Sequence, residues 1–308
     1  MNRTKHVCLW STGVTVLGTF LATVTGFADM PIAIDSIEAL QRIGQDPAYP
    51  LNGAYVLTGD IDASETVNWN DGAGFLPIGA PATLAAGTTP GDEESAGVTD
   101  KSLFFNGWFD GQGYRIRGLY INRPETQGVG LFGTLAATAV VVNVGIEGGS
   151  ITGAHYVGGL AGGNWSESVS ACYSTAAVSG ISRIGSLIGI NRGFVDACFA
   201  TGPVQGDHFI GGLVGRNYKG VIQECYAAGP VAGNRWVGGL TGNAVESEAI
   251  ACFWDTTTSG TTFSAGGTGE TTATLMLPQT YTAAGWDFNS IWGMRQGKEY
   301  PYLKSVWK

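Results

Sequence analysis

Ile210-Gly-Gly-Leu-Val-Gly215 is the stretch that decides the fold, because close copies of it recur along the chain. The copies are Val157-Gly-Gly-Leu-Ala-Gly162, Ile184-Gly-Ser-Leu-Ile-Gly189, Val237-Gly-Gly-Leu-Thr-Gly242 and the shorter Val129-Gly-Leu-Phe-Gly133. The leucines of the four full copies follow one another after 27, 26 and 27 residues: Leu160, Leu187, Leu213 and Leu240. A period of this length is typical of a stacked repeat, in which each unit buries its apolar side chains against the next.

Each repeat unit contains three short segments that favour strands. In one unit these are Val204-Gln-Gly206, the stretch Ile210–Gly215, and a segment that ends in Cys225-Tyr226. Coils built from such segments bury their apolar residues and pair their backbones only when they stack ~4.8 Å apart. We therefore predict an all-β protein: a single parallel β-helix (β-solenoid) of five to six coils, with about 27 residues and three strands per coil.

Stacking places equivalent residues of successive coils in columns. Asn164, Asn191 and Asn217 share one repeat position, and we predict that their amides form a ladder. Four cysteines share another position: Cys172, Cys198, Cys225 and Cys252. An even number of cysteines permits two disulfides in an exported protein, but side chains in register point the same way and fit the required torsion poorly. We favour a buried column of free thiols, and disulfide pairing remains the alternative.

The first 28 residues predict a signal peptide. Arg3 and Lys5 precede an apolar run, and Gly26-Phe-Ala28 places small residues where a signal peptidase cleaves, so we expect cleavage near Ala28. No later segment is apolar enough to span a membrane. Removing residues 1–28 reduces the 16 basic residues to 14 against 25 acidic ones, a net charge of −11. This charge disfavours nucleic acid as a partner.

The remaining chain divides into three predicted regions. Residues 29–127 form an N-terminal cap and the first coils, with one helix from Ala33 to Gly44 and a surface loop at 80–101. Residues 128–260 hold the repeats, and residues 261–308 form an aromatic-rich C-terminal cap over the last coil. Both caps are expected because the end coils of a solenoid otherwise expose unpaired strand edges.

The sequence resembles proteins that carry the GLUG motif, named for its Gly-Leu-x-Gly core. The resemblance also includes Leu57–Asp62, Phe109–Tyr114, the cysteine-aromatic segments and Tyr300–Leu303. It implies a bacterial protein that is secreted or displayed on the cell surface. The motif also occurs in accessory regions of IgA-specific metallopeptidases and in large adhesin-like proteins.

A candidate binding surface lies just before each Gly-Gly-Leu segment. One repeat position is occupied by Tyr156, Arg183, Phe209 and Trp236, and the position before it by His155, Ser182, His208 and Arg235. Strand alternation from the inward Val or Ile predicts that the first set points outward as a stripe on a flat face. Such a stripe suits sugar rings or a protein partner; alternatively, the side chains only stack on one another and stabilise the ladder. The predicted ligand-binding residues are Tyr156, Arg183, Phe209, Trp236, His155, His208 and Arg235.

We predict no catalytic residues, no metal and no cofactor. The sequence has no His-Glu-x-x-His motif, and the repeat acids Asp196, Asp207 and Glu224 occupy different repeat positions, so they build no carboxylate column. A strand predicted from Tyr55 to Asp62 would place Asp60 and Asp62 on one face, where they could hold Ca²⁺. Carboxylates at strand ends more commonly bind local backbone amides, which we favour here.

These observations predict a non-enzymatic, exported surface or matrix protein, secreted or on the cell surface. Its expected role is adhesion or glycan binding through a flat face of the solenoid, with a glycan or another cell-envelope or host-surface component as partner. Two alternatives remain: a β-helix enzyme that degrades polysaccharides as a lyase or glycoside hydrolase, and a structural spacer without a specific ligand.

Overall fold

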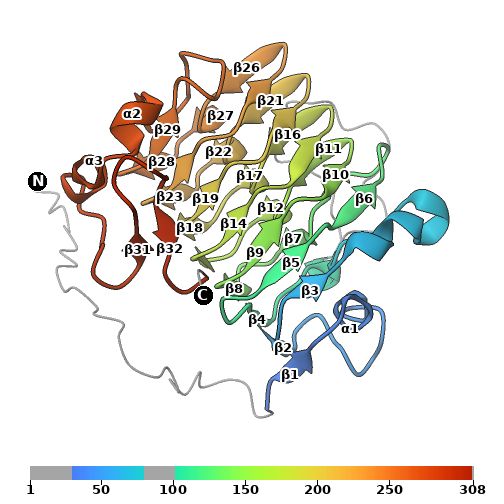
Figure 1. Cartoon of the computed structure of the whole chain (residues 1–308). Helices are drawn as coiled ribbons and strands as arrows, with labels where there is room; N and C mark the ends of the chain where they lie inside the picture. Colours follow the sequence, from blue (N-terminus) through green and yellow to red (C-terminus); the bar gives the residue numbers. More distant parts are fainter. Residues whose placement is uncertain (1–29, 80–100, 307–308) are drawn as a thin grey trace, which may run out of the picture.

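Short parallel strands stack into one solenoid in the computed structural model, which describes residues 30–79 and 101–306. The solenoid has about seven turns of about 27 residues each, which confirms the predicted fold class. Five parallel sheets run along its sides, and one short antiparallel pair lies in the C-terminal segment (Figure 1). The predicted signal peptide and nearly all of the predicted loop at 80–101 lie outside the described residues.

Two sheets have eight strands each, and we name each sheet after one of its strands. The β1 sheet consists of β1 (Ile32–Ile34), β2 (Ala54–Leu57), β4 (Trp108–Asp110), β8 (Val140–Val142), β13 (Ser168–Ser170), β18 (Phe194–Asp196), β23 (Val221–Gln223) and β28 (Glu248–Ile250). The β3 sheet consists of β3 (Ile61–Asp62), β5 (Arg115–Arg117), β9 (Gly145–Glu147), β14 (Tyr173–Ser174), β19 (Phe199–Ala200), β24 (Tyr226–Ala227), β29 (Phe253–Asp255) and β30 (Thr268–Glu270).

The other three parallel sheets are shorter. The β10 sheet consists of β6 (Tyr120–Asn122), β10 (Ser150–Thr152), β15 (Ala177–Ser179), β20 (Val204–Gln205) and β25 (Val231–Ala232). The β11 sheet consists of β11 (His155–Gly158), β16 (Ser182–Gly185), β21 (His208–Gly211) and β26 (Arg235–Gly238). The β12 sheet consists of β7 (Phe132–Leu135), β12 (Ala161–Asn164), β17 (Ile188–Asn191), β22 (Val214–Tyr218) and β27 (Thr241–Val245).

A full coil therefore holds five strands, where the sequence predicted three. The predicted segment that ends in Cys172-Tyr173 is divided into β13 and β14 by Ala171, whose φ of 51° turns the chain. Glu224 has a φ of 47° at the equivalent place two coils later. A non-glycine residue in the left-handed region does not change the pattern of apolar residues, so this corner could not be predicted from the sequence. The predicted five to six coils were also too few, because the first turns lack the Gly-Gly-Leu segment.

Identical residues stack through the core. Val157 of β11 pairs with Ile184, which pairs with Ile210, and all three side chains are fully buried. The motif leucines, such as Leu187 and Leu213, are equally buried. Burial of one such aliphatic side chain stabilises the fold by ~1.5–3 kcal/mol, and each coil repeats the gain.

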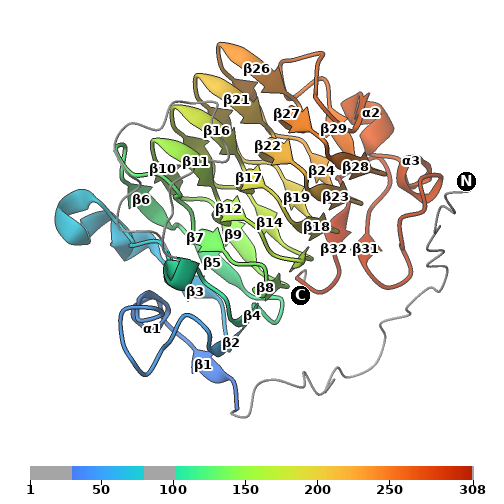
Figure 2. The ribbon, with the colours of Figure 1, turned by 180° about the vertical axis from the view of Figure 1, so that it is seen from behind.

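The last glycine of each motif lets two sheets approach closely. A Cβ atom built on Gly189 of β17 would lie 2.5 Å from backbone atoms of Tyr156 and Val157, and one on Gly215 would lie 2.4 Å from the nitrogen of Ile184. No side chain fits at such distances, so only glycine permits the β12 sheet to pack on the backbone of the β11 sheet. Figure 2 shows these two sheets side by side along one edge of the solenoid.

The predicted asparagine ladder is confirmed. Asn164 donates from Nδ2 to Oδ1 of Asn191 at 2.8 Å, and Asn191 donates to Oδ1 of Asn217 at 2.9 Å. Asn217 closes the ladder by donating to the carbonyl of Glu248 at 3.1 Å. All three asparagines are buried, so each bond replaces one that water would otherwise supply.

The predicted thiol column is also confirmed. Cys172, Cys198, Cys225 and Cys252 are buried and free. The amide of Cys172 donates to Sγ of Cys198 at 3.4 Å, and each thiol donates to a backbone carbonyl, as Cys225 does to Gln223 at 3.0 Å. Burial raises the pKa of the Cys172 and Cys225 thiols, so these groups stay protonated and behave as small apolar residues.

The N-terminal region begins with a strand, where the sequence predicted a helix from Ala33. β1 pairs in parallel with β2 and extends the β1 sheet by one strand. Helix α1 (Ile37–Gln41) follows, and the side chain of its N-cap Ser36 accepts a hydrogen bond from the amide of Ala39. Ile37 and Leu40 are buried in the core, so α1 covers this end of the solenoid. Short 3-10 turns follow at Ser64–Asn68, Asn70–Gly72 and Lys101–Leu103.

The C-terminal aromatic segment packs along the side of the solenoid, and residues 259–270 cover part of the last coil. Phe263 accepts a hydrogen bond from the amide of Gly239, and β30 pairs with β29. The rings of Tyr173, Phe199 and Tyr226 stack in a column on the β3 sheet. The aromatic side chains of the C-terminal segment pack against this column; the segment contains α2 (Thr272–Leu275), α3 (Pro278–Thr282), β31 (Trp292–Gly293) and β32 (Tyr302–Leu303). Tyr226 of that column donates to Pro301 at 2.7 Å, and Trp286 donates to Ala251 at 2.8 Å. Helices of the described ranges are all too short to cross a membrane.

Candidate functional site

The predicted binding residues lie on the β11 sheet, but strand alternation is not what positions them. His155 pairs with Ser182, and Val157 pairs with Ile184, whereas the residues between them are left out of the pairing. Tyr156, Arg183, Phe209 and Trp236 all have left-handed backbone, with φ of 57°, 62°, 57° and 52°. The chain turns at each of these residues, and the turns stack from coil to coil. We call these four residues the first column.

The side chains of the first column cover one another. Cζ of Arg183 lies 5.1 Å from the ring centroid of Tyr156 and 5.2 Å from that of Phe209. The rings of Phe209 and Trp236 stack with centroids 4.5 Å apart and planes 9° apart. A left-handed non-glycine residue costs ~1–2 kcal/mol, which cation–π and ring stacking of similar size offset.

Arg183 is therefore not presented to solvent as the sequence suggested. Only 2% of the residue is exposed, because its guanidinium lies between two rings and donates to Oγ of Ser182 at 3.1 Å. Tyr156 and Phe209 are half-buried and have ring faces taken by Arg183. For these three residues the geometry favours the stacking alternative over ligand contact.

Trp236 differs from the other members because the column ends with it. β26 is the last strand of the β11 sheet. The segment that follows forms backbone hydrogen bonds with Gly239 and Thr241 and none with Trp236. The residue is 48% exposed, with one ring face on Phe209. The opposite face is open, which makes it the accessible aromatic platform of the column.

Polar side chains surround this platform. His208 Nδ1 lies 2.7 Å from Oδ2 of Asp207, and the His208 ring centroid lies 6.1 Å from that of Trp236. The other oxygen of Asp207 accepts from Nδ2 of Asn234 at 2.6 Å. Asn234 and Arg235 directly precede Trp236 in the chain and are exposed. Together these groups offer donors and acceptors around one apolar face.

His155, also predicted as a binding residue, lies away from this group. It shares a sheet position with His208, but Ser182 stands between them on the intervening coil. Burial first, and then the charge of Arg183, lower the pKa of His155, so its imidazole stays neutral. The structure therefore brings His208, Arg235 and Trp236 together and leaves His155 outside.

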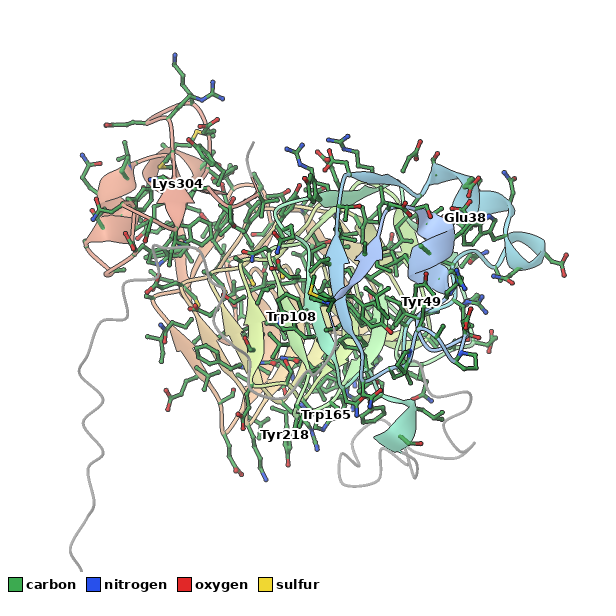
Figure 3. All side chains as sticks on the ribbon, turned by 90° about the horizontal axis from the view of Figure 1, so that it is seen from below. Glu38, Tyr49, Trp108, Trp165, Tyr218 and Lys304 are labelled. Carbon is green, nitrogen blue, oxygen red and sulfur yellow. The ribbon has the colours of Figure 1, made fainter. Side chains whose placement is uncertain are left out.

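A second column of aromatic and cationic side chains was missed from the sequence. Cζ of Arg192 lies 5.6 Å from the ring centroid of Trp165 and 4.7 Å from that of Tyr218. Figure 3 shows Trp165 and Tyr218 projecting from one edge of the molecule. Each residue of this second column directly follows a ladder asparagine, so aligning the repeats on Asn164 and Asn217 could have revealed it.

Arg216 joins the two columns. Its Cζ lies 5.3 Å from the ring centroid of Phe209 in the first column and 5.3 Å from that of Tyr218 in the second. Lys219 adds a further cation, 5.2 Å from the Tyr218 ring. Rings and cations therefore alternate across the edge formed by the β11 and β12 sheets.

One complete coil corresponds to a known sequence family. The family model described as the GLUG motif matches residues 153–179, which begin directly after β10 and run through β11, β12, β13 and β14 to the end of β15. The chain carries the GLUG motif. In this coil the Gly-Leu-x-Gly core supplies the buried Leu160 and the closely packed Gly162, so the motif serves the fold.

Two curated proteins are similar to parts of this GLUG-motif chain. Halomucin of Haloquadratum walsbyi is 37% identical over 173 residues, which are 56% of this chain and 2% of halomucin. A protein of Evansella cellulosilytica described as "Putative Gly-rich membrane protein" is 38% identical over 85 residues, which are 27% of this chain and 10% of that protein. The chain thus spans only a small part of either relative.

A solved structure shares the fold. The crystal structure described as "a putative immunoglobulin A1 protease from Bacteroides ovatus" superposes with a TM-score of 0.62 and covers 89% of this chain and 92% of its own. The two sequences are 16% identical. A likeness at this level of identity shows a common solenoid and no more.

Asp60 and Asp62, considered as Ca²⁺ ligands, are engaged by protein groups. The predicted strand from Tyr55 to Asp62 is divided between β2 and β3, which belong to different sheets. Oδ1 of Asp62 accepts from the amide of Ser64 at 2.9 Å, and Oδ1 of Asp60 accepts from the amide of Arg115 at 3.0 Å. The hydrogen bond from Ser64 lowers the pKa of Asp62. Both carboxylates bind backbone amides, the arrangement that the sequence favoured.

Proposed function

We propose that this GLUG-motif protein is an exported, non-enzymatic surface or matrix protein that binds glycans at the open face of Trp236. The observation that carries the proposal is the end of the first column: one ring face packs on Phe209, and 48% of the residue is exposed. An exposed tryptophan face offers a rigid apolar platform to the C–H face of a sugar ring.

Neighbouring groups complete the proposed site. Hydroxyl groups of a sugar both donate and accept hydrogen bonds, and Asn234, Arg235 and the His208–Asp207 pair supply both kinds of partner beside the ring. The site lies at the end of a rigid stack, so binding would require little ordering of the protein.

Export and the absence of catalysis are parts of the same proposal. Residues 1–28 have the features of a signal peptide, and similarity to the Evansella protein, which is described as a membrane protein, supports a role at the cell envelope. The non-enzymatic role rests on the repeat positions of Asp196, Asp207 and Glu224, which differ, so these acids build no carboxylate column. Paired carboxylates at a sugar-cleaving distance would be needed for glycoside hydrolysis.

A structural spacer is the second candidate, and one observation favours it. Arg183 fills the space between the rings of Tyr156 and Phe209, so most of the first column makes contacts within the protein. A solenoid without a ligand would gain stability from the same stack.

A glycan array and a cell-retention assay test the proposal with the full chain. The wild-type protein should be retained, and Trp236→Ala should lose retention while keeping its β-rich circular dichroism. Val67→Ala is the matched control, because Val67 is similarly exposed, at 47%, in the N-terminal region. Retention of Trp236→Ala at the wild-type level would refute the site, and a wild-type protein that binds no glycan or cell favours the spacer. New reducing or unsaturated ends from a polysaccharide panel would overturn the non-enzymatic role.

A further inference from the structure

We infer that the glycan bound at Trp236 is anionic, with a carboxylate or sulfate group held by Arg235; this inference rests on the proposed function. Arg235 directly precedes Trp236 on β26 and is exposed. A guanidinium binds carboxylate and sulfate oxygens through parallel hydrogen bonds, and it does so with more directional preference than a lysine. The site therefore pairs an apolar platform with an anion-binding group.

Arg235 stands apart from the other arginines of the described ranges. Most of them bind acids or carbonyls, as Arg42 does with Asp46, Arg117 with Glu147 and Arg123 with Phe75. Arg183, Arg192 and Arg216 lie over aromatic rings. Within residues 30–79 and 101–306, the Arg235 side chain has no hydrogen bond, ion pair or ring contact. After signal-peptide removal the chain has 25 acids for 14 bases, so an unpaired exposed arginine is unusual here.

Asp207, which contacts the Arg235 backbone, does not neutralise the Arg235 side chain. Asp207 accepts the amide of Arg235 through its backbone carbonyl at 2.9 Å, but its carboxylate is held by Asn234 and His208. Both carboxylate oxygens therefore have partners that are not the guanidinium. The charge of Arg235 remains available to an incoming group.

Further cations lie behind the platform. Arg183 and Arg216 each lie within 5.3 Å of the Phe209 ring, and that ring stacks on Trp236. They add positive potential beneath the site in a protein whose net charge is strongly negative. The net negative charge of the protein repels an anionic polymer at long range. A local cluster of arginines can still bind such a polymer, because charge interactions are screened over distance.

Calorimetric titration of the full chain tests the inference with two matched probe pairs. One pair is an oligogalacturonate and its carboxyl-reduced neutral form, and the other is a sulfated oligosaccharide and its desulfated form. The wild type should bind at least one anionic probe about tenfold tighter than its neutral partner, and the preferred pair tells carboxylate from sulfate. Arg235→Gln should lose that preference, Trp236→Ala should weaken anionic and neutral binding together, and the paired-arginine control Arg42→Gln should change neither.

Different outcomes overturn different claims. Unchanged anionic affinity in Arg235→Gln, or equal wild-type affinity for both members of each pair, contradicts the anionic ligand. If Trp236→Ala still loses binding in that case, glycan binding at the platform stands. Unchanged binding in Trp236→Ala contradicts both glycan binding at Trp236 and the anionic ligand. If the wild type binds neutral glycans on the array but no anionic probe, only the anionic ligand is contradicted.

Discussion

The rings of Phe209 and Trp236 stack with centroids 4.5 Å apart and planes 9° apart. This contact covers one face of Trp236 and leaves the other open, because no further strand of the β11 sheet follows β26 in the described residues. Deeper in the same column, Arg183 separates Tyr156 from Phe209. The column thus changes along its length from an internal support to an accessible platform.

Replacement of Arg183 tests the support. Arg183→Met keeps an unbranched apolar stem but removes the guanidinium that lies over two rings, so we expect a loss of ~1–2 kcal/mol in the free energy of unfolding. Urea denaturation followed by circular dichroism measures it. Arg235→Met is the control, because Arg235 is exposed and lies two strands further along the same sheet. Its free energy of unfolding should stay within ~0.5 kcal/mol of the wild-type value. Equal stabilities for wild type and Arg183→Met would show that the stack contributes nothing.

The asparagine ladder should be most sensitive at its centre. Asn191→Ala leaves Nδ2 of Asn164 without its acceptor and Oδ1 of Asn217 without its donor, both in buried positions. We expect destabilisation of ~2–4 kcal/mol, since each unsatisfied buried group costs ~1–3 kcal/mol. Chemical denaturation measures the change, with Asn122→Ala as a control on an exposed strand residue. A loss no larger than that of the control would mean that the ladder is energetically neutral.

The cysteine column makes a redox prediction. Cys172, Cys198, Cys225 and Cys252 should all react with a thiol reagent when unreduced protein is unfolded in guanidinium. None should react in the native state, because burial blocks access and raises the pKa of Cys172 and Cys225. Colorimetric thiol counting under both conditions gives the answer. Absence of free thiols after unfolding would mean that the four residues form disulfides.

Asp196 predicts a pH dependence of stability. Burial raises the pKa of Asp196 from 3.8 to about 7, and the neighbouring carboxyl group of Glu224 acts in the same direction. Between these two values the folded state keeps a proton that the unfolded state has released, so stability falls as pH rises from about 4 to about 7 and is flat above. Asp196→Asn should remove this part of the slope and raise stability at pH 7.5 by ~2–4 kcal/mol. Parallel stability profiles for the variant and the wild type between pH 4 and 7.5 would contradict the assignment.

The repeat period explains which features could be predicted from the sequence. It fixes the register of Leu187, Asn191 and Cys198, so the core and both ladders follow from spacing alone. The corners at Ala171 and Tyr156 could not be predicted, because left-handed backbone at a non-glycine residue has no signature in the apolar pattern.

The candidate site could likewise be predicted only in part from the repeat period. The repeat period predicts the first column, but the burial of Arg183 and the exposure of Trp236 follow from side-chain packing and could not be predicted from it. The contact of Tyr226 with the C-terminal segment is a long-range one with no periodic signal, so the side packing of that segment was also missed. Spacing predicts columns, whereas exposure within a column depends on where the sheet ends.

The most direct test compares two rings of the first column against one ligand. For a glycan identified on the array, affinities of Trp236→Ala and Tyr156→Ala are measured by calorimetry beside the wild type. We predict a loss of at least tenfold for Trp236→Ala and a change within twofold for Tyr156→Ala, because Arg183 covers the Tyr156 ring while Trp236 has an open face. Equal losses in both variants, or an unchanged affinity in Trp236→Ala, would contradict the assignment of the binding platform to the end of the column.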